Sequence, residues 1–185
     1  MGAIVLVVIA VVGIMGIMAY NSLVRRRNMV DQAFSTIDVQ LTQRYDLIPK
    51  LVETVKQYMT HERSLLEEIV RLRSRAVATH DPVEKVRADN DLTRAMGQLN
   101  VTMENYPQLK ASDTFVQLQR SLNEVEEQLA AARRSYNAAV TDYNNTVQTF
   151  PSSLVASTAG FGLRQTFVAE EAKRRDVDMK SLFKA

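Results

Sequence analysis

An uncharged stretch at the N-terminus constrains this chain more than any other feature. Residues 1–24 contain no Lys, Arg, Asp or Glu, although charged residues make up 24% of the 185-residue chain. Ala3 to Tyr20 form an apolar run, and about 20 such residues span a bilayer as a helix. A cleaved signal peptide would carry a basic residue before a shorter apolar core, and none precedes this run. The pattern predicts an uncleaved transmembrane anchor at residues 1–24.

The basic residues Arg25, Arg26 and Arg27 follow the anchor directly. Clusters of Lys and Arg beside a membrane helix favour the cytoplasmic side. We therefore expect a single-pass protein inserted in the lipid bilayer, with its N-terminus outside and the remainder of the chain in the cytoplasm.

Composition argues against several kinds of chemistry. The chain has no cysteine, which excludes disulfides, thiolate zinc sites and iron–sulfur clusters. The formal net charge of +2 gives no electrostatic basis for binding nucleic acid. The two histidines, His61 and His80, lack the Glu-x-x-His and HExxH spacings of metal sites, and no phosphate-binding glycine loop is present. The sequence predicts a protein that is not an enzyme and has no cofactor or metal.

After the anchor, apolar residues recur at alternating steps of three and four, which is a helical period. The predicted fold is all-α: the transmembrane helix is followed by a long antiparallel helical bundle over residues 25–167. The bundle has three long helices, or four if the first breaks near Pro49. Because the apolar pattern keeps its phase across Pro49, we favour a kink there over a reversal.

The expected boundaries follow from the breakers and caps. The first bundle helix continues from the anchor to about Ala78, and Asp81 caps a second helix that ends near Asn105. A third helix starts at Ser112 or Asp113 and closes at Phe150. Residues 152–167 are expected to pack on the bundle, and residues 168–185 to form a mobile charged tail.

These lengths leave part of the first helix uncovered. It is expected to be about 85 Å long, whereas the second and third helices reach only about 36 and 58 Å. The stripe of Val30, Phe34, Ile37 and Leu41 would then face solvent near the membrane. We expect this stripe to mediate self-association, making the protein a homo-oligomer.

Replacing Phe34 and Ile37 with glutamate should then dissociate the oligomer, because charges would enter its apolar contact. Light scattering of the full-length protein in detergent measures the mass, and an unchanged mass would contradict the expectation.

Polar residues interrupt the apolar stripes at two places. Asp38, Arg44 and Asp46 do so in the first helix, and Tyr136-Asn137 recurs seven residues later as Tyr143-Asn144. Residues seven apart face the same way on a helix. Such residues commonly form buried hydrogen bonds that fix the register of a bundle. The alternative is that this polar seam lines a groove for a partner or a small ligand.

Several ordered motifs resemble the LemA family of bacterial membrane proteins. They lie between Asn21 and Phe167: Ile37-Asp38-Val39-Gln40-Leu41, Arg44-Tyr45-Asp46-Leu47-Ile48-Pro49, Leu51-Val52-Glu53-Thr54-Val55-Lys56, Tyr58 with His61-Glu62, Tyr106-Pro107 with Leu109-Lys110-Ala111, Phe115 with Leu118-Gln119, Glu126, Arg133, Tyr136-Asn137, Val140, Tyr143-Asn144 and Phe150-Pro151-Ser152. One departure is Lys50, where the family often has Asn. The resemblance implies a membrane helix followed by a helical bundle, in the bacterial inner membrane.

The resemblance carries over no active-site residue. Related proteins are associated with the bacterial envelope and, in one branch, with magnetosome membranes. This implies a membrane-anchored scaffold or adaptor that presents its bundle to an unidentified membrane or envelope protein. Two alternatives stay open: a regulatory adaptor of a membrane signalling kinase or protease, and a bundle that binds a small ligand through the polar seam.

Overall fold

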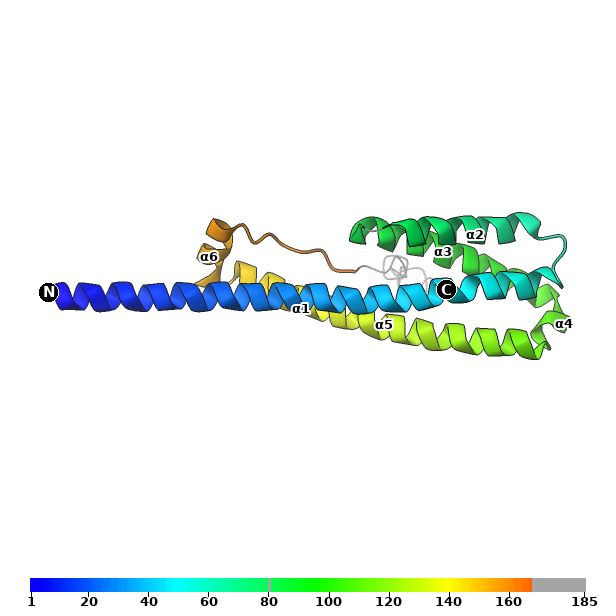
Figure 1. The fold of residues 1–185 in the computed structure, drawn as a ribbon, viewed down its shortest axis with the longest axis horizontal. Helices are drawn as coiled ribbons and strands as arrows, with labels where there is room; N and C mark the ends of the chain where they lie inside the picture. Colours follow the sequence, from blue (N-terminus) through cyan, green and yellow to red (C-terminus); the bar gives the residue numbers. More distant parts are fainter. Residues whose placement is uncertain (80, 168–185) are drawn as a thin grey trace, which may run out of the picture. The chain divides into compact units, whose positions relative to one another are not determined.

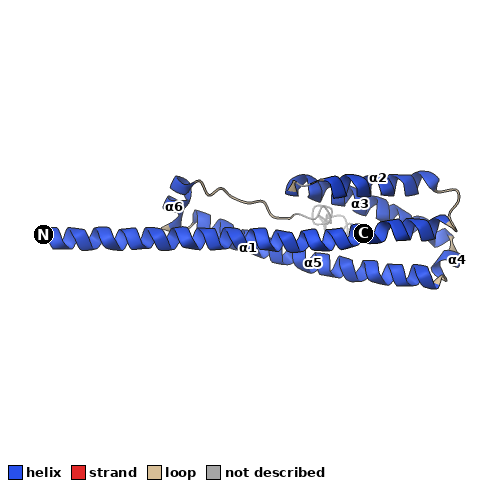
Figure 2. Ribbon diagram, viewed as in Figure 1, coloured by secondary structure: helices blue, strands red, loops and turns tan. Residues whose placement is uncertain are grey.

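A computed structural model of the chain describes residues 1–79 and 81–167, and this part is all-α (Figures 1 and 2). The helices, in chain order, are α1 (Gly2–Lys56), α2 (Arg63–Ala78), α3 (Pro82–Thr102), the 3-10 turn η1 (Met103–Asn105), α4 (Pro107–Lys110), α5 (Asp113–Gln148) and α6 (Ser152–Ala159). The predicted fold class is therefore confirmed. The predicted charged tail, residues 168–185, lies outside the described residues.

Helix α1 is a single helix of 55 residues that continues through Pro49. A proline inside a helix costs about 3 kcal/mol because it removes one hydrogen bond and crowds the preceding turn. Here the helix is held on both sides of the proline, since Tyr45, Ile48 and Leu51 are each at most 2% exposed. The chain does not reverse at Pro49, as the unbroken phase of the apolar pattern predicts.

The first bundle helix ends at Lys56, so the expectation that it continues to Ala78 is wrong. Residues 57–62 form a turn, and α2 then begins at Arg63. The sequence signal is the run of five polar residues, Thr60 to Ser64, between the buried Met59 and Leu66. A helix through this run would have left a full turn without an apolar anchor. The reversal makes the bundle four-helical.

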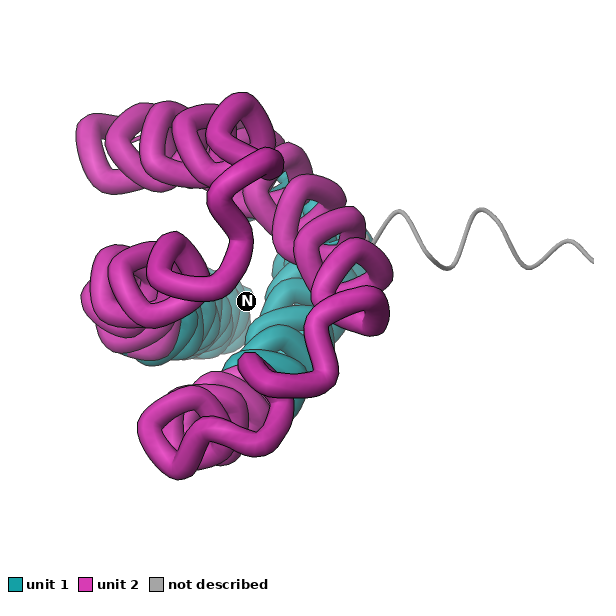
Figure 3. Tube along the Cα trace, turned by 90° about the vertical axis from the view of Figure 1, so that its right-hand side faces the viewer, with its two compact units in different colours: residues 1–39, 129–167 teal, residues 40–128, 168–185 magenta. Residues whose placement is uncertain are grey.

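The described chain divides into two compact units, coloured separately in Figure 3. In the second unit, residues 40–128, the end of α1, helices α2 and α3 and the start of α5 surround a core of aliphatic and methionine side chains with Tyr45 and Phe115. Helix α3 begins as the sequence predicts, because the Asp81 carboxylate accepts a hydrogen bond from the Glu84 amide at 2.9 Å.

The first unit comprises residues 1–39 and 129–167. The apolar run from Ala3 to Tyr20 forms the first part of α1, and we call it the apolar extension. Beyond it, α1 packs along the second half of α5. Val30, Val140 and Tyr143 are at most 2% exposed and form the centre of this contact. Helix α6 ends at Ala159 and is capped by Gly160, whose φ of 74° lies in the left-handed region that favours glycine. From there residues 160–167 run without regular secondary structure.

The apolar stripe on α1 is covered within the single chain, so the expectation that it is exposed is wrong. Val30, Ile37 and Leu41 are at most 2% exposed, and the ring of Phe34 packs edge-on against Tyr136, with centroids 5.9 Å apart. The length argument failed because α1 ends at Lys56, and the 36-residue α5 is long enough to accompany it. Glutamate at Phe34 and Ile37 would disturb this fold, so that substitution does not isolate an oligomer contact.

Candidate functional site

The most specific polar arrangement in the first unit joins α5 to residues 160–167, which we call the C-terminal segment. One side of α5 presents Tyr136, Asn137, Tyr143 and Asn144, which we call the asparagine face. All four side chains bond to main-chain atoms of the C-terminal segment. The sequence predicted that the two Tyr-Asn pairs share one side of the helix, but not what they bind.

Each asparagine makes a pair of hydrogen bonds with one residue of the segment. The Asn137 amide nitrogen donates to the Phe167 carbonyl at 3.0 Å, and the Phe167 amide donates back to the Asn137 oxygen at 2.6 Å. Asn144 binds Arg164 in the same way, at 2.8 and 2.9 Å. A carboxamide thus takes the place that a neighbouring peptide group holds in a β-ladder. The two asparagines satisfy main-chain groups of a segment that has no internal secondary structure.

The spacing of the two pairs follows from helix and strand geometry. Seven residues of helix advance about 10.5 Å. Three extended residues, from Arg164 to Phe167, advance about 10 Å. The segment lies antiparallel to α5, since the later segment residue pairs with the earlier helix residue. One heptad of α5 therefore matches three residues of an extended chain.

The two tyrosines add a hydrogen bond each. The Tyr143 hydroxyl donates to the Gly162 carbonyl at 2.9 Å, and the Tyr136 hydroxyl donates to the Gln165 carbonyl at 3.1 Å. Burial raises the pKa of Tyr136, with Asp31 acting in the same direction and Arg164 opposing. The Tyr136 hydroxyl therefore stays protonated at neutral pH and available as a donor.

Two phenylalanines anchor the ends of the segment. The Phe161 ring packs edge-on against Tyr20 at a centroid distance of 5.7 Å and has the Arg27 guanidinium 5.5 Å from its centroid. Phe167 is 6% exposed and has the Arg133 guanidinium 4.7 Å from its ring centroid. Cations over ring faces are attracted by the aromatic quadrupole. Both ends of the segment thus insert an aromatic ring beside an arginine.

Ion pairs also join the elements of this unit. Arg164 Nη2 lies 3.7 Å from Asp31 Oδ1 of α1, and Arg26 pairs with Asp142 of α5. Of the three basic residues that follow the apolar extension, Arg26 and Arg27 therefore contact the rest of the unit, and Arg25 is exposed. Their role in setting membrane orientation stays a prediction.

The second unit contains a buried ionic network centred on Arg44, which is 3% exposed. Its guanidinium lies 2.9 Å from Asp89 Oδ1, 3.0 Å from the Thr93 hydroxyl and 2.7 Å from Glu126 Oε1. The Tyr45 hydroxyl also donates to Asp89, at 3.4 Å. Sequence analysis identified Arg44 but missed Asp89. The available signal was that Asp89 falls between Val86 and Leu92 in the apolar pattern of its helix.

The other seam candidates on α1 lie in different surroundings. Asp46 is exposed, and its carboxylate lies 3.8 Å from Arg73. Asp38 belongs to the first unit and is half-buried. The predicted polar seam is therefore divided: Arg44 organises one unit, and Asn137 and Asn144 organise the other.

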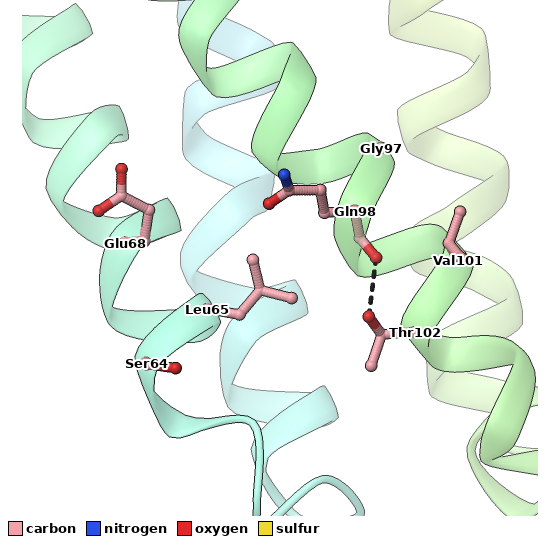
Figure 4. A pocket seen from close by; sticks show the side chains of 7 residues that line it. All are labelled: Ser64, Leu65, Glu68, Gly97, Gln98, Val101 and Thr102. Atoms are coloured by element: carbon pink, nitrogen blue, oxygen red, sulfur yellow. Dashed lines mark hydrogen bonds between the residues drawn. The ribbon is translucent and has the colours of Figure 1, made fainter.

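A separate hollow of about 730 Å³ lies between α2 and α3 (Figure 4). Its lining residues are Ser64, Leu65, Glu68, Gly97, Gln98, Val101 and Thr102. None of the polar seam candidates belongs to this lining. Within the described residues, no group of three His, Cys, Asp or Glu side chains is placed to hold a metal ion.

The fold defines a class of protein. The first part of α1 is long and apolar enough to cross a membrane, and none of its 18-residue apolar window is buried. The same helix then enters a helical bundle without a break. A profile described as the LemA family matches residues 33–180, and the chain belongs to this family.

Named relatives agree with this assignment. Protein LemA of Metamycoplasma hominis is 29% identical over 163 residues, which cover 88% of this chain and 74% of the relative. Magnetosome protein MamQ 2 of Paramagnetospirillum magneticum is 31% identical over 96 residues, covering 52% of this chain and 35% of the relative. Magnetosome protein MamQ of Magnetospirillum gryphiswaldense is 31% identical over 74 residues, covering 40% and 27%. The similarity to the MamQ proteins thus involves only about a third of their length.

Replacing Asp89 with Ala should lower the free energy of unfolding by about 3 kcal/mol, because the buried Arg44 loses its most buried partner. Replacing both residues, Arg44→Met with Asp89→Leu, should recover most of the loss. Arg63→Ala removes an exposed pair with Glu67 and should cost less than about 1 kcal/mol. Denaturation of the full-length protein in detergent, followed by circular dichroism, measures all three. A loss for Asp89→Ala as small as that for Arg63→Ala would contradict the prediction.

Replacing Asn144 with Ala should release the Arg164 amide, while the Phe167 amide stays protected by Asn137. Loss of one such hydrogen bond is worth about 1 kcal/mol, so amide hydrogen exchange at Arg164 should accelerate about fivefold. Asn137→Ala should have the converse effect. Asn145→Ala, at the exposed neighbouring position of α5, is the matched control and should change neither amide. Equal acceleration in all three variants would show that the asparagines do not hold the segment.

Proposed function

We propose that this LemA-family protein is a single-pass, membrane-anchored adaptor whose helical bundle binds membrane or envelope proteins and catalyses no reaction. The observation that carries the proposal is the continuity of α1. The exposed apolar run and the buried Val30 of the first unit belong to one helix, so a membrane anchor would be joined to that unit without a flexible linker. A protein-binding platform benefits from such fixed placement, because ordering a linker on binding costs entropy.

We further propose the inner membrane of a bacterium, with the N-terminus outside and the bundle in the cytoplasm. The support is the cluster Arg25, Arg26 and Arg27 at the end of the apolar run. Self-association remains a proposal, but its contact residues must differ from those first expected. It would have to use residues other than Val30, Ile37 and Leu41, because these are already buried within one chain.

The absence of cysteine from the sequence allows a direct test of anchoring and orientation. Single cysteines are placed at Gly2 and at Val101, which is 69% exposed. In intact cells a membrane-impermeant maleimide should label Gly2→Cys, whereas Val101→Cys should react only after the membrane is opened. Both variants should remain in the membrane pellet after an alkaline wash. Labelling of Val101→Cys in intact cells would contradict the proposed orientation and place the bundle outside. Release of the protein by the wash would contradict the membrane anchor.

The adaptor role has its own readout. A photocrosslinking amino acid at Val101, in α3, or at Val116, in α5, should join the bundle to a defined protein in living cells. The adduct should be lost when the anchor is replaced by a cleavable signal peptide, because the bundle then leaves its membrane position. Crosslinks that are identical with and without the anchor would contradict a membrane adaptor.

A further inference from the structure

We propose that the asparagine face and the adjoining residues of α1 form a binding groove for an extended peptide segment of a partner protein. The C-terminal segment, residues 160–167, fills this groove in the chain itself and acts as a tethered competitor. The inference rests on the proposed adaptor function for the existence of a partner, and it names where and how that partner binds.

The first argument is that the hydrogen bonds of the asparagine face go to the main chain of the segment. Asn137, Asn144, Tyr136 and Tyr143 contact carbonyl and amide groups of Gly162, Arg164, Gln165 and Phe167. Every peptide carries these groups at the same spacing, so any chain in an extended conformation can make the bonds. The asparagine face therefore recognises an extended backbone and does not depend on one sequence.

The second argument is that few side chains of the segment are recognised. Leu163 is 60% exposed, and Gln165 and Thr166 are also exposed. A Cβ atom added to Gly162 would have no atom within 4 Å, so the groove does not require glycine there. The contacts that remain are the rings of Phe161 and Phe167 and the pairing of Arg164 with Asp31.

These contacts define a ligand. It has an aromatic residue at its first position, a basic residue three positions later and a second aromatic residue three positions after that. The first ring lies beside Tyr20 and Arg27, the basic group beside Asp31, and the second ring beside Arg133. An extended peptide with this aromatic-x-x-basic-x-x-aromatic pattern satisfies the same groups as the chain's own segment.

The connection to α5 argues against exchange of the segment between two copies. The Ser152 hydroxyl donates to the Thr146 carbonyl at 2.6 Å and to the Thr149 carbonyl at 2.8 Å. These bonds fix the start of α6 against the end of α5 and direct the segment back along its own helix. A segment from a second copy would have to give up this placement, whereas a partner peptide only has to displace residues 160–167.

The tether makes the wild-type groove hard to reach. A ligand joined by a short link acts at a millimolar effective concentration. A free peptide of the same sequence must compete with it. Weakening the chain's own segment should therefore increase the affinity for an added peptide by about 100-fold.

The test uses the full-length protein in detergent and a fluorescent synthetic peptide with the sequence of residues 159–167. A variant with Phe161, Arg164 and Phe167 all replaced by Ala should bind this peptide about 100-fold more tightly than wild type. Adding Asn137→Ala and Asn144→Ala to that variant should weaken binding at least tenfold, whereas adding the control Asn145→Ala should not. A peptide with both phenylalanines replaced by Ala keeps the main-chain bonds but should bind at least tenfold more weakly.

Charge reversal tests the register. In the variant with Phe161, Arg164 and Phe167 replaced by Ala, adding Asp31→Arg should weaken binding of the native peptide. The same change should strengthen binding of a peptide that carries Glu in place of Arg164. Equal binding of the phenylalanine-free peptide, or failure of charge reversal to switch preference, would overturn the proposed recognition. Hydrogen exchange at residues 164 and 167 shows whether the chain's own segment is displaced. If these amides stay protected when Phe161, Arg164 and Phe167 are all replaced by Ala, these three side chains do not hold the segment in the groove. The proposal then fails.

Two further results would assign the groove or the function differently. Disulfide formation between separate chains carrying Asp31→Cys and Arg164→Cys, with a dimeric mass, would make a second copy the occupant and overturn the partner proposal. Absence of peptide binding together with persistent, anchor-dependent crosslinks at Val101 would overturn the groove while leaving the adaptor function. Peptide binding in detergent, in a protein that is not anchored to the membrane in cells, would overturn the adaptor function and leave the groove.

Discussion

The fold depends on one helix that must satisfy two different environments. The first part of α1 is apolar on every side, and its apolar window is exposed among the described residues. Further along, only one side is apolar, and that side is buried against α5 around Val30, Val140 and Tyr143. Since backbone hydrogen bonds are complete within a helix, the same helix is stable in both environments. The other elements cover this apolar side, which is buried at Val30, Ile37 and Leu41.

Much of this arrangement is readable from the sequence, because it follows from periodicity and caps. The uncharged run, the start of α3 after Asp81 and the start of α5 at Asp113 are local signals, and the structure contains them. The turn at residues 57–62 contains neither Gly nor Pro. The sequence signal for this turn was a missing apolar position. This signal is weaker than a Gly, a Pro or a capping residue, because a single polar turn can also occur inside a long helix. Because the first helix was expected to continue to Ala78, its apolar stripe was wrongly expected to be uncovered.

The polar residues show a different limit of sequence reasoning. Arg44 and the two asparagines stood out because they interrupt an apolar pattern. Their partners could not be inferred, because Asp89 and the main chain of residues 164–167 are brought near only by folding. The asparagines are also hard to interpret alone, since a carboxamide can serve a neighbouring helix, a loop or a ligand. The seven-residue repeat predicts that they act together, and the three-residue spacing of their partners becomes visible only in the structure.

The antiparallel placement of the C-terminal segment has a mechanical consequence. The segment starts beside Tyr20, at the end of the apolar extension, and runs along α5 away from it. A force applied at Phe167 and directed away from the extension acts along the segment, so both asparagine pairs carry the load together. A force directed sideways at Phe167 loads the Asn137 pair first and then the Asn144 pair. The attachment is therefore strong against pulling along the helix and weak against peeling from it.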